Sequence, residues 1–250
     1  MTVNGQRVCE LPVLVDPEHD VIRVDRRRIE ASRKIYYLLH KPTGVLCTAS
    51  DPAGRKRAID LLRGVRERVY PVGRLDADSD GLLLMTNDGE LANQLTHPRY
   101  GTPKTYRVEI EGTISATGVD KLRNGIWLDD GRTQPARIKI VHRGRVRSVI
   151  EITLREGRNR QVRRMLARLG HRVRKLTRVK IGRITLHGLG VGRFRPLTTA
   201  ELDHLKRLSR NEAGPTRQTR RPGKPLKKFT KKKKKSRSRR VNLPGGPARA

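Results

Sequence analysis

Four charged side chains fall close together in one stretch of the chain, where they could do chemistry. Gly73-Arg74-Leu75-Asp76 is followed by Asp78-Ser79-Asp80-Gly81 and then by the apolar run Leu82–Met85. Asp76 therefore stands at the edge of an apolar segment, in a chain whose formal net charge is +34. Three hypotheses compete for this carboxylate: a calcium ligand, a solvated turn residue, or a nucleophile that acts on a polyanion.

The calcium hypothesis rests on a partial match to an EF-hand loop. Asp76 to Gly81 agrees with the first six positions of such a loop. The match fails at the ninth position, which is the apolar Leu84, and at the twelfth, where Asn87 stands in place of the bidentate glutamate. Residues 70–73, Tyr-Pro-Val-Gly, are not typical of the helix that precedes an EF-hand loop. We therefore expect no metal site here.

The turn hypothesis suits Asp78 and Asp80, because aspartate side chains bond to nearby backbone amides in turns. It suits Asp76 less well, since Asp76 directly follows Leu75 at the end of a predicted buried strand. Partial burial raises the pKa of a carboxyl group, so a cationic partner is needed to keep the group ionised. A carboxylate that attacks as an anion requires that arrangement, which favours Asp76 as a nucleophile.

Several motifs, in this order along the chain, resemble those of the bacterial ribosomal RNA pseudouridine synthases. The resemblance is to the branch that modifies single uridines in small- and large-subunit rRNA, and most closely to its large-subunit members. It runs from about Lys34 to Leu208. The motifs that carry it are His40–Val45, Gly73–Asp76 with Gly81–Gly89, Lys104–Val108 and Glu156–Met165.

The resemblance implies an isomerase that converts a uridine of rRNA to pseudouridine, with Asp76 as the catalytic nucleophile. It also implies that Tyr106 lies against the target base and that Arg163 forks onto the Asp76 carboxylate. A uridine inside folded RNA has to be extruded before it can reach such a pocket. Neither a metal ion nor an organic cofactor is implied.

Basic residues around these motifs predict contacts with the RNA backbone. The cluster Arg158, Arg160, Arg163 and Arg164 opens a predicted helix, and at most one of its guanidinium groups should face Asp76, while the others bind phosphate. A non-catalytic RNA-binding or ribosome-assembly protein on the same fold is the alternative function, since the charge suits it equally well. The predicted RNA-binding residues are Arg74, Lys104, Arg158, Arg160 and Arg164.

Charge also indicates the class of partner. The chain has 58 Lys and Arg against 24 Asp and Glu, a balance that favours nucleic acid, here rRNA or a pre-ribosomal particle. No run approaches the roughly 18 apolar residues that would suggest a membrane-spanning helix. The separated Cys9 and Cys47 and the absence of a signal-peptide pattern are typical of a reduced cytoplasmic setting. We expect a monomer without an obligate protein partner.

Strand patterns outnumber helical patterns and do not alternate regularly with them. This order predicts an α+β fold in which helices flank a mixed, largely antiparallel sheet. Local signals mark helix ends, among them Ser115 with Gly125, Asn159 with Gly170, and a capping box from Thr198 to Glu201. Strands are predicted at residues 35–39, 69–75, 82–86, 104–111, 135–141, 146–155, 173–181 and 184–186.

Composition divides the chain into three parts. Residues 1–30, with an Asn4-Gly5 turn, resemble the second half of a small RNA-binding domain first known from a ribosomal small-subunit protein, without its two opening helices. Residues 34–208 form the predicted catalytic domain. Residues 211–250 are rich in Lys and Arg, which predicts a disordered tail that adds sequence-independent affinity for phosphates.

Overall fold

The computed structural model describes residues 1–210 except 11, 17–18 and 31, so the predicted tail of residues 211–250 lies outside the described residues. Its first part is a four-stranded sheet of β1 (Thr2–Val3), β2 (Gln6–Arg7), β3 (Ile22–Val24) and β4 (Arg27–Arg28). Asn4 and Gly5 between β1 and β2 have φ angles of 51° and 85°. Positive φ at both positions is the geometry of a two-residue hairpin turn, so the turn expected there is confirmed.

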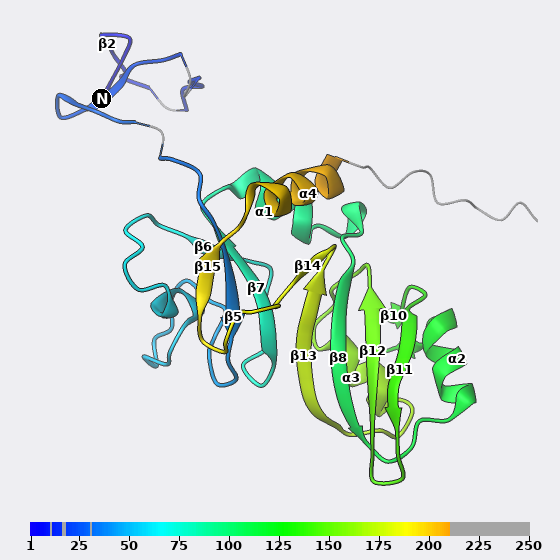
Figure 1. Cartoon of the computed structure of the whole chain (residues 1–250). Helices are drawn as coiled ribbons and strands as arrows, with labels where there is room; N and C mark the ends of the chain where they lie inside the picture. The colour runs from blue at the N-terminus through cyan, green and yellow to red at the C-terminus, as the bar shows by residue number, and fades with distance from the viewer. Residues whose placement is uncertain (11, 17–18, 31, 211–250) are drawn as a thin grey trace, which may run out of the picture. The chain divides into compact units, whose positions relative to one another are not determined.

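The larger part of the chain is built on a nine-stranded sheet (Figure 1). Its strand order is β11-β12-β8-β13-β7-β5-β15, with β14 paired to β13 and β6 paired to β7. Every pair is antiparallel except β13 with β7, so the expected α+β fold with a mixed, largely antiparallel sheet is confirmed. The strands are β5 (Tyr36–Lys41), β6 (Tyr70–Val72), β7 (Asp80–Thr86), β8 (Lys104–Glu111), β11 (Arg137–Arg143), β12 (Arg147–Leu154), β13 (Val173–Ile181), β14 (Ile184–Thr185) and β15 (Phe194–Pro196).

Helix ends follow local capping chemistry. The Ser115 hydroxyl accepts a hydrogen bond from the Gly118 amide, and Asp88 does the same for Leu91. Thr198 and Glu201 exchange hydrogen bonds in the predicted capping box. The elements concerned are α1 (Gly89–Thr96), α2 (Ala116–Asn124), α3 (Gln161–Ala167) and α4 (Thr199–Arg210), with 3₁₀ turns η1 (Ala58–Leu61) and η2 (Pro98–Tyr100) and a small hairpin of β9 (Trp127–Leu128) and β10 (Gly131–Arg132).

Helix α3 departs from the expected pattern at its start. Arg160, rather than Asn159, occupies the N-cap position, in the left-handed region with φ of 45°. No side chain caps the amide groups of the first helical turn, and the Gln161 side chain instead accepts the amide of Arg158, ahead of the helix, at 3.1 Å. The backbone of Arg160 is therefore not helical. Its guanidinium group bonds to the Asp78 carboxylate.

Three apolar clusters fill the space on the two faces of the sheet. Strand β7 is buried along its whole length, with Leu82 and Leu84 in one cluster and Leu83 and Met85 in another on the opposite face. This alternation is what a strand covered on both sides requires. A third cluster packs the inner residues of β8, β11 and β12 against α2 and α3.

The two halves of the sheet meet where β7 pairs with β13. The pairing spans only Thr177 with Asp80 and Arg178 with Gly81. A Cβ atom on Gly81 would lie 2.4 Å from the Arg178 carbonyl oxygen, and the φ angle of Gly81 is +117°. Only glycine fits such an approach, and it comes directly after the acidic loop identified in the sequence.

Candidate active site

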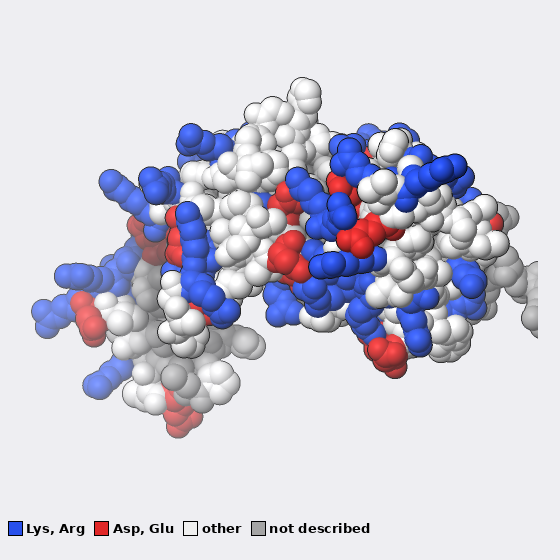
Figure 2. Space-filling view, turned by 90° about the horizontal axis from the view of Figure 1, so that it is seen from below, with Lys and Arg blue, Asp and Glu red and all other residues white. Residues whose placement is uncertain are grey.

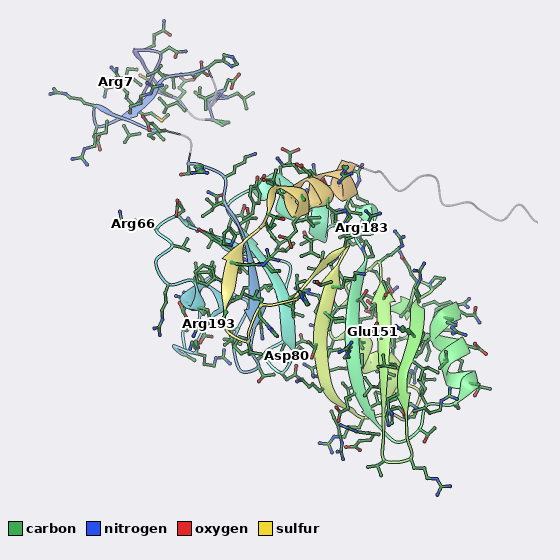
Figure 3. All side chains as sticks on the ribbon, in the orientation of Figure 1. Arg7, Arg66, Asp80, Glu151, Arg183 and Arg193 are labelled. Atoms are coloured by element: carbon green, nitrogen blue, oxygen red, sulfur yellow. The ribbon has the colours of Figure 1, made fainter. Side chains whose placement is uncertain are left out.

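A cavity of about 280 Å³ opens at this junction and brings together five of the eight predicted site residues. Its walls come from residues 73–76 before β7, from Tyr106 on β8 and Leu176 on β13, and from residues 156–162 at the start of α3. Figure 3 labels Asp80 near this position, at the lower end of β7. The five predicted residues that line the cavity are Arg74, Asp76, Tyr106, Arg158 and Arg160.

The loop that carries Asp76 is held through its backbone. The Asp76 carbonyl accepts the Ser79 amide at 3.1 Å, and the Ala77 carbonyl accepts the Gly44 amide at 2.7 Å. The Asp78 carbonyl accepts Nη2 of Arg163 at 3.1 Å. The Ser79 carbonyl accepts Nζ of Lys41 at 2.7 Å. Four consecutive carbonyl groups therefore have donors, which fixes the direction in which the Asp76 side chain leaves the loop.

Lys41 is a part of this support that sequence reasoning did not assign. Its side chain is fully buried, and Nζ also donates to the Pro42 carbonyl at 3.0 Å. Burial lowers the pKa of Lys41, while the nearby Cys47, Asp80, Asp78 and Asp76 raise it again. The only sequence signal was its place in the His40–Val45 motif.

The Asp76 carboxylate faces the cavity with its side chain 31% exposed and with Arg160 as its ion-pair partner. Nη1 of Arg160 lies 3.6 Å from Oδ2 of Asp76. This distance is longer than a direct charged hydrogen bond. Asp76 thus keeps an accessible carboxylate beside a cation, the arrangement expected of a nucleophile that reacts as an anion.

The expected pair between Arg163 and Asp76 is not what the structure forms. Arg163 instead lies 3.3 Å from the Asp78 carboxylate, which also accepts two bonds from Arg160 at 2.9 and 3.3 Å. The Arg160 hydrogen bonds hold the pKa of Asp78 below its usual range. Both guanidinium groups therefore pair with the Asp78 carboxylate, two residues after Asp76.

Asp80 was predicted to be a turn residue, and this prediction is wrong. Asp80 is the first residue of β7 and is 8% exposed. Its Oδ2 lies 3.6 Å from Nζ of Lys175, and it faces β13 across the parallel pair. A local turn signal could not reveal this, because the burial comes from β13, nearly a hundred residues later.

Arg158 and Arg164 were predicted to bind RNA, but both guanidinium groups have acceptors inside the protein. Arg158 donates to the carbonyl groups of Asp130, Gly131 and Arg132 at 3.1, 2.9 and 2.6 Å. Arg164 forks onto the Asp130 carboxylate at 2.7 and 3.0 Å, which lowers the pKa of Asp130 to about 2. These contacts tie the start of α3 and the loop before it to the β9–β10 hairpin, and the RNA-binding role of both residues stays a prediction.

Lys104 also lies in a different setting from the one predicted. Nζ donates to the carbonyl groups of Leu95 and Thr102, both at 3.3 Å, beneath the surface of the sheet. Burial, together with the charge of Arg178, lowers the pKa of Lys104 to about 8. Arg178 is itself 2% exposed and donates from Nε to the Leu82 carbonyl at 2.7 Å. Lys104 therefore ties the start of β8 to the end of α1 and to the segment between them.

Tyr106 lines the cavity from strand β8. It is half-buried on β8, opposite Ile152 on one side and Arg178 on the other, and its ring packs against the apolar cluster beneath the cavity. Tyr106 and Asp76 line the same cavity from opposite halves of the sheet. The remaining predicted residue in that wall, Arg74, has no ion-pair partner among the described residues.

Two further classes of site were searched for in the described part of the chain. No group of three or more His, Cys, Asp or Glu side chains there is placed to hold a metal ion. Within the same residues, every helix is too short or too polar to cross a lipid bilayer.

Comparison with known proteins shows the family of the chain. The 250-residue chain is 44% identical over 209 residues to the ribosomal large subunit pseudouridine synthase B of Bacillus subtilis, covering 83% of this chain and 85% of that protein. It is 36% identical to the ribosomal small subunit pseudouridine synthase A of Yersinia pestis, over 81% of this chain and 86% of that protein. A crystal structure of a pseudouridylate synthase superposes with a TM-score of 0.65 at 30% identity, covering 82% of this chain and 87% of that one. The sequence profile of the RNA pseudouridylate synthase family matches residues 35–168, and the chain belongs to that family.

Proposed function

We propose that this protein isomerises a uridine of ribosomal RNA to pseudouridine, with Asp76 as the nucleophile. The observation that carries the proposal is the geometry of Asp76: an accessible carboxylate on a loop with four bonded carbonyl groups, 3.6 Å from Arg160. Binding of RNA alone would need the basic surface but would not need a carboxylate held in this way. The family membership supports the same reaction.

The chemistry needs a single base in the cavity. The reaction breaks the bond between ribose C1′ and N1 of uracil and forms a bond between C1′ and C5. N1 gains a proton and C5 loses one, so the composition of the nucleotide does not change and no oxidant or reductant is consumed. A cavity of about 280 Å³ lies near the lower end of small-ligand sites, roughly 300 Å³, which suits one nucleobase.

Each cavity residue has a distinct task in this proposal. The target uridine flips out of the RNA and enters between Tyr106 and Asp76, with the tyrosine ring against the base. Asp78 holds Arg160 and Arg163 beside the nucleophile, so that their positive charge offsets the carboxylate's desolvation when the base excludes water. The Asp76 anion then attacks the nucleotide.

The RNA reaches this site through the charge of the surrounding surface. Seen from below, Lys and Arg side chains spread over the molecule, with acidic side chains gathered among them near the middle (Figure 2). Phosphates are attracted to such a surface and released counterions add to the affinity. We propose large-subunit rRNA as the substrate, because the identity to the large-subunit enzyme, 44%, exceeds the 36% to the small-subunit enzyme.

Replacement of the nucleophile tests the proposal. Asp76→Asn keeps the size of the side chain and removes its charge, so pseudouridine formation should fall by at least about 1,000-fold, as when another enzyme loses its nucleophile. RNA binding should stay within about twofold, because the basic surface is unchanged. The product is measured on unmodified rRNA fragments by carbodiimide treatment and reverse-transcription stops.

The control is Asp203→Asn, which removes the same charge from an exposed position on α4 and should leave the rate unchanged. A near wild-type rate for Asp76→Asn would overturn the assignment of the nucleophile. Wild-type protein that binds every rRNA fragment without modifying any of them would instead support a ribosome-assembly role.

A further inference from the structure

Trp127 is the single tryptophan of the chain, and it lies on the surface. Its exposed fraction is 66%, while every described Tyr and Phe is at least half-buried. Exposure of so large an apolar side chain gains nothing for the fold, since burial would release about 25 cal/mol for each Å² removed from water. Exposed apolar surface of this kind often marks a binding site, so we expect a binding partner at Trp127.

The backbone under Trp127 is rigidly fixed. Trp127 pairs with Arg132 across the β9–β10 hairpin, and the neighbouring Ile126 and Thr133 exchange hydrogen bonds at 2.9 Å. Leu128 is 6% exposed and belongs to the apolar cluster under the sheet, so the next side chain, that of Trp127, points away from it. Gly125 lets the hairpin begin directly after α2, because a Cβ atom there would lie 2.3 Å from the Thr133 carbonyl oxygen.

The same hairpin is joined to the candidate active site. Arg158, which lines the cavity with Asp76, donates to three successive carbonyl groups of the hairpin, including that of Arg132 at 2.6 Å. Gln134, just after the hairpin, donates its amide to the buried Glu156 at 2.9 Å. The hairpin that carries Trp127 is thus held at a fixed place relative to Arg158 in the cavity wall.

A guanidinium group, that of Arg132, lies on the strand next to the exposed ring. Arg132, the cross-strand partner of Trp127, is exposed and donates to the Asn124 carbonyl at 3.2 Å, and no carboxylate lies within 4.0 Å of it among the described residues. An aromatic face next to an available guanidinium group is the combination that binds an unpaired nucleotide: the ring stacks on the base, and the cation meets its phosphate.

We propose that Trp127 stacks on an unpaired nucleobase of the RNA that flanks the target uridine, with Arg132 on the adjoining phosphate. This inference rests on the proposed function, and it adds a second base-binding position outside the cavity. Because each base offers a π-face, the position selects unpaired RNA over duplex more strongly than one base over another. It would favour target uridines that have single-stranded neighbours.

Tryptophan fluorescence gives a direct test, because Trp127 alone produces the indole signal. Asp76→Asn protein is titrated with an rRNA hairpin whose target uridine lies in a loop with unpaired flanks. We expect the emission to be quenched on binding, and the quenching to disappear when the flanks are annealed to a complementary strand. Binding without any change in emission from the unpaired substrate would overturn the proposal.

Affinity measurements give a second, independent test. Loss of one stacked base should weaken binding of the unpaired substrate by roughly 5- to 100-fold in Trp127→Ala. Trp127→Phe should recover most of the affinity, and both variants should bind the annealed substrate as the unchanged protein does. Val146→Ala, which trims an apolar side chain that is 76% exposed on another hairpin, is the control and should have no effect.

Equal affinities of Trp127→Ala and the unchanged protein for the unpaired substrate would refute the stacking position. So would a Trp127→Ala variant that keeps its RNA affinity but loses an interaction with a ribosomal protein, since the occupant would then be a protein. Neither readout depends on isomerisation. A failure here therefore leaves the role of Asp76 untouched, and a failure of Asp76 leaves this result standing.

Discussion

Replacing Arg158 by alanine tests whether this residue stabilises the fold or binds RNA. The side chain donates to three hairpin carbonyl groups at 2.6 to 3.1 Å and to the buried Glu156 carboxylate at 3.2 Å. A hydrogen bond that involves a charged group contributes about 1.5 kcal/mol or more. With the Arg158 side chain 25% exposed, about 1 kcal/mol for each carbonyl bond is the appropriate value. The free energy of unfolding should therefore fall by about 3 kcal/mol.

Thermal denaturation measures this loss. For a domain of this size, about 3 kcal/mol lowers Tm by about 6 to 12 °C. Arg155→Ala is the matched control: it removes the same charge from the same segment, but Arg155 is exposed and makes one bond of 3.4 Å, to the Gly101 carbonyl. Its Tm should change by less than about 2 °C.

The salt dependence of RNA binding completes the experiment. If Arg158 contacted a phosphate, its loss would reduce the slope of log K against log salt by about 1. We expect the slope to stay unchanged. A variant with an unchanged Tm and a reduced slope would refute the structural role and restore Arg158 to the RNA-binding residues.

Two more predictions concern the neighbours of the site. Asp78→Asn removes the charge that holds Arg160 and Arg163, so single-turnover pseudouridine formation should drop about 10- to 100-fold with RNA binding intact; a rate within twofold of the unchanged protein would contradict this. Burial lowers the pKa of Lys104 from 10.5 to about 8 in the folded state. The unfolded chain therefore binds the extra proton between those pH values, and this group makes stability rise as pH increases through that window, by up to about 3 kcal/mol. Denaturant titrations should show a smaller rise in the free energy of unfolding with pH for Lys104→Met than for the unchanged protein. An equal rise in both proteins would show that Lys104 is not its source.

Much of the local structure could be predicted from the sequence. Helix caps such as Ser115 and the Thr198–Glu201 box depend on residues three positions apart, so their signals survive without tertiary context. Strand β8 has the predicted bounds, Lys104–Glu111, because one buried face imposes a period of two. The sequence motif also singled out Asp76, which lines the cavity.

Pairings between distant segments could not be predicted. Arg160 and Arg163 lie more than eighty positions after Asp78, so no local pattern reveals that they pair with its carboxylate. Arg158 and Lys104 carry charges that predict a solvated surface, yet the tertiary structure surrounds them with carbonyl groups.

The sequence by itself determined the chemistry and the order of the elements, because side-chain type and short-range periodicity are local properties. Only the tertiary structure decided that Arg160 lies beside Asp76 and that Lys41 bonds to the backbone of the same loop. It also decided that Trp127 stays exposed. The physical reason is that ion pairs and burial depend on which segments pack together. That packing is set by the whole core and not by any one motif.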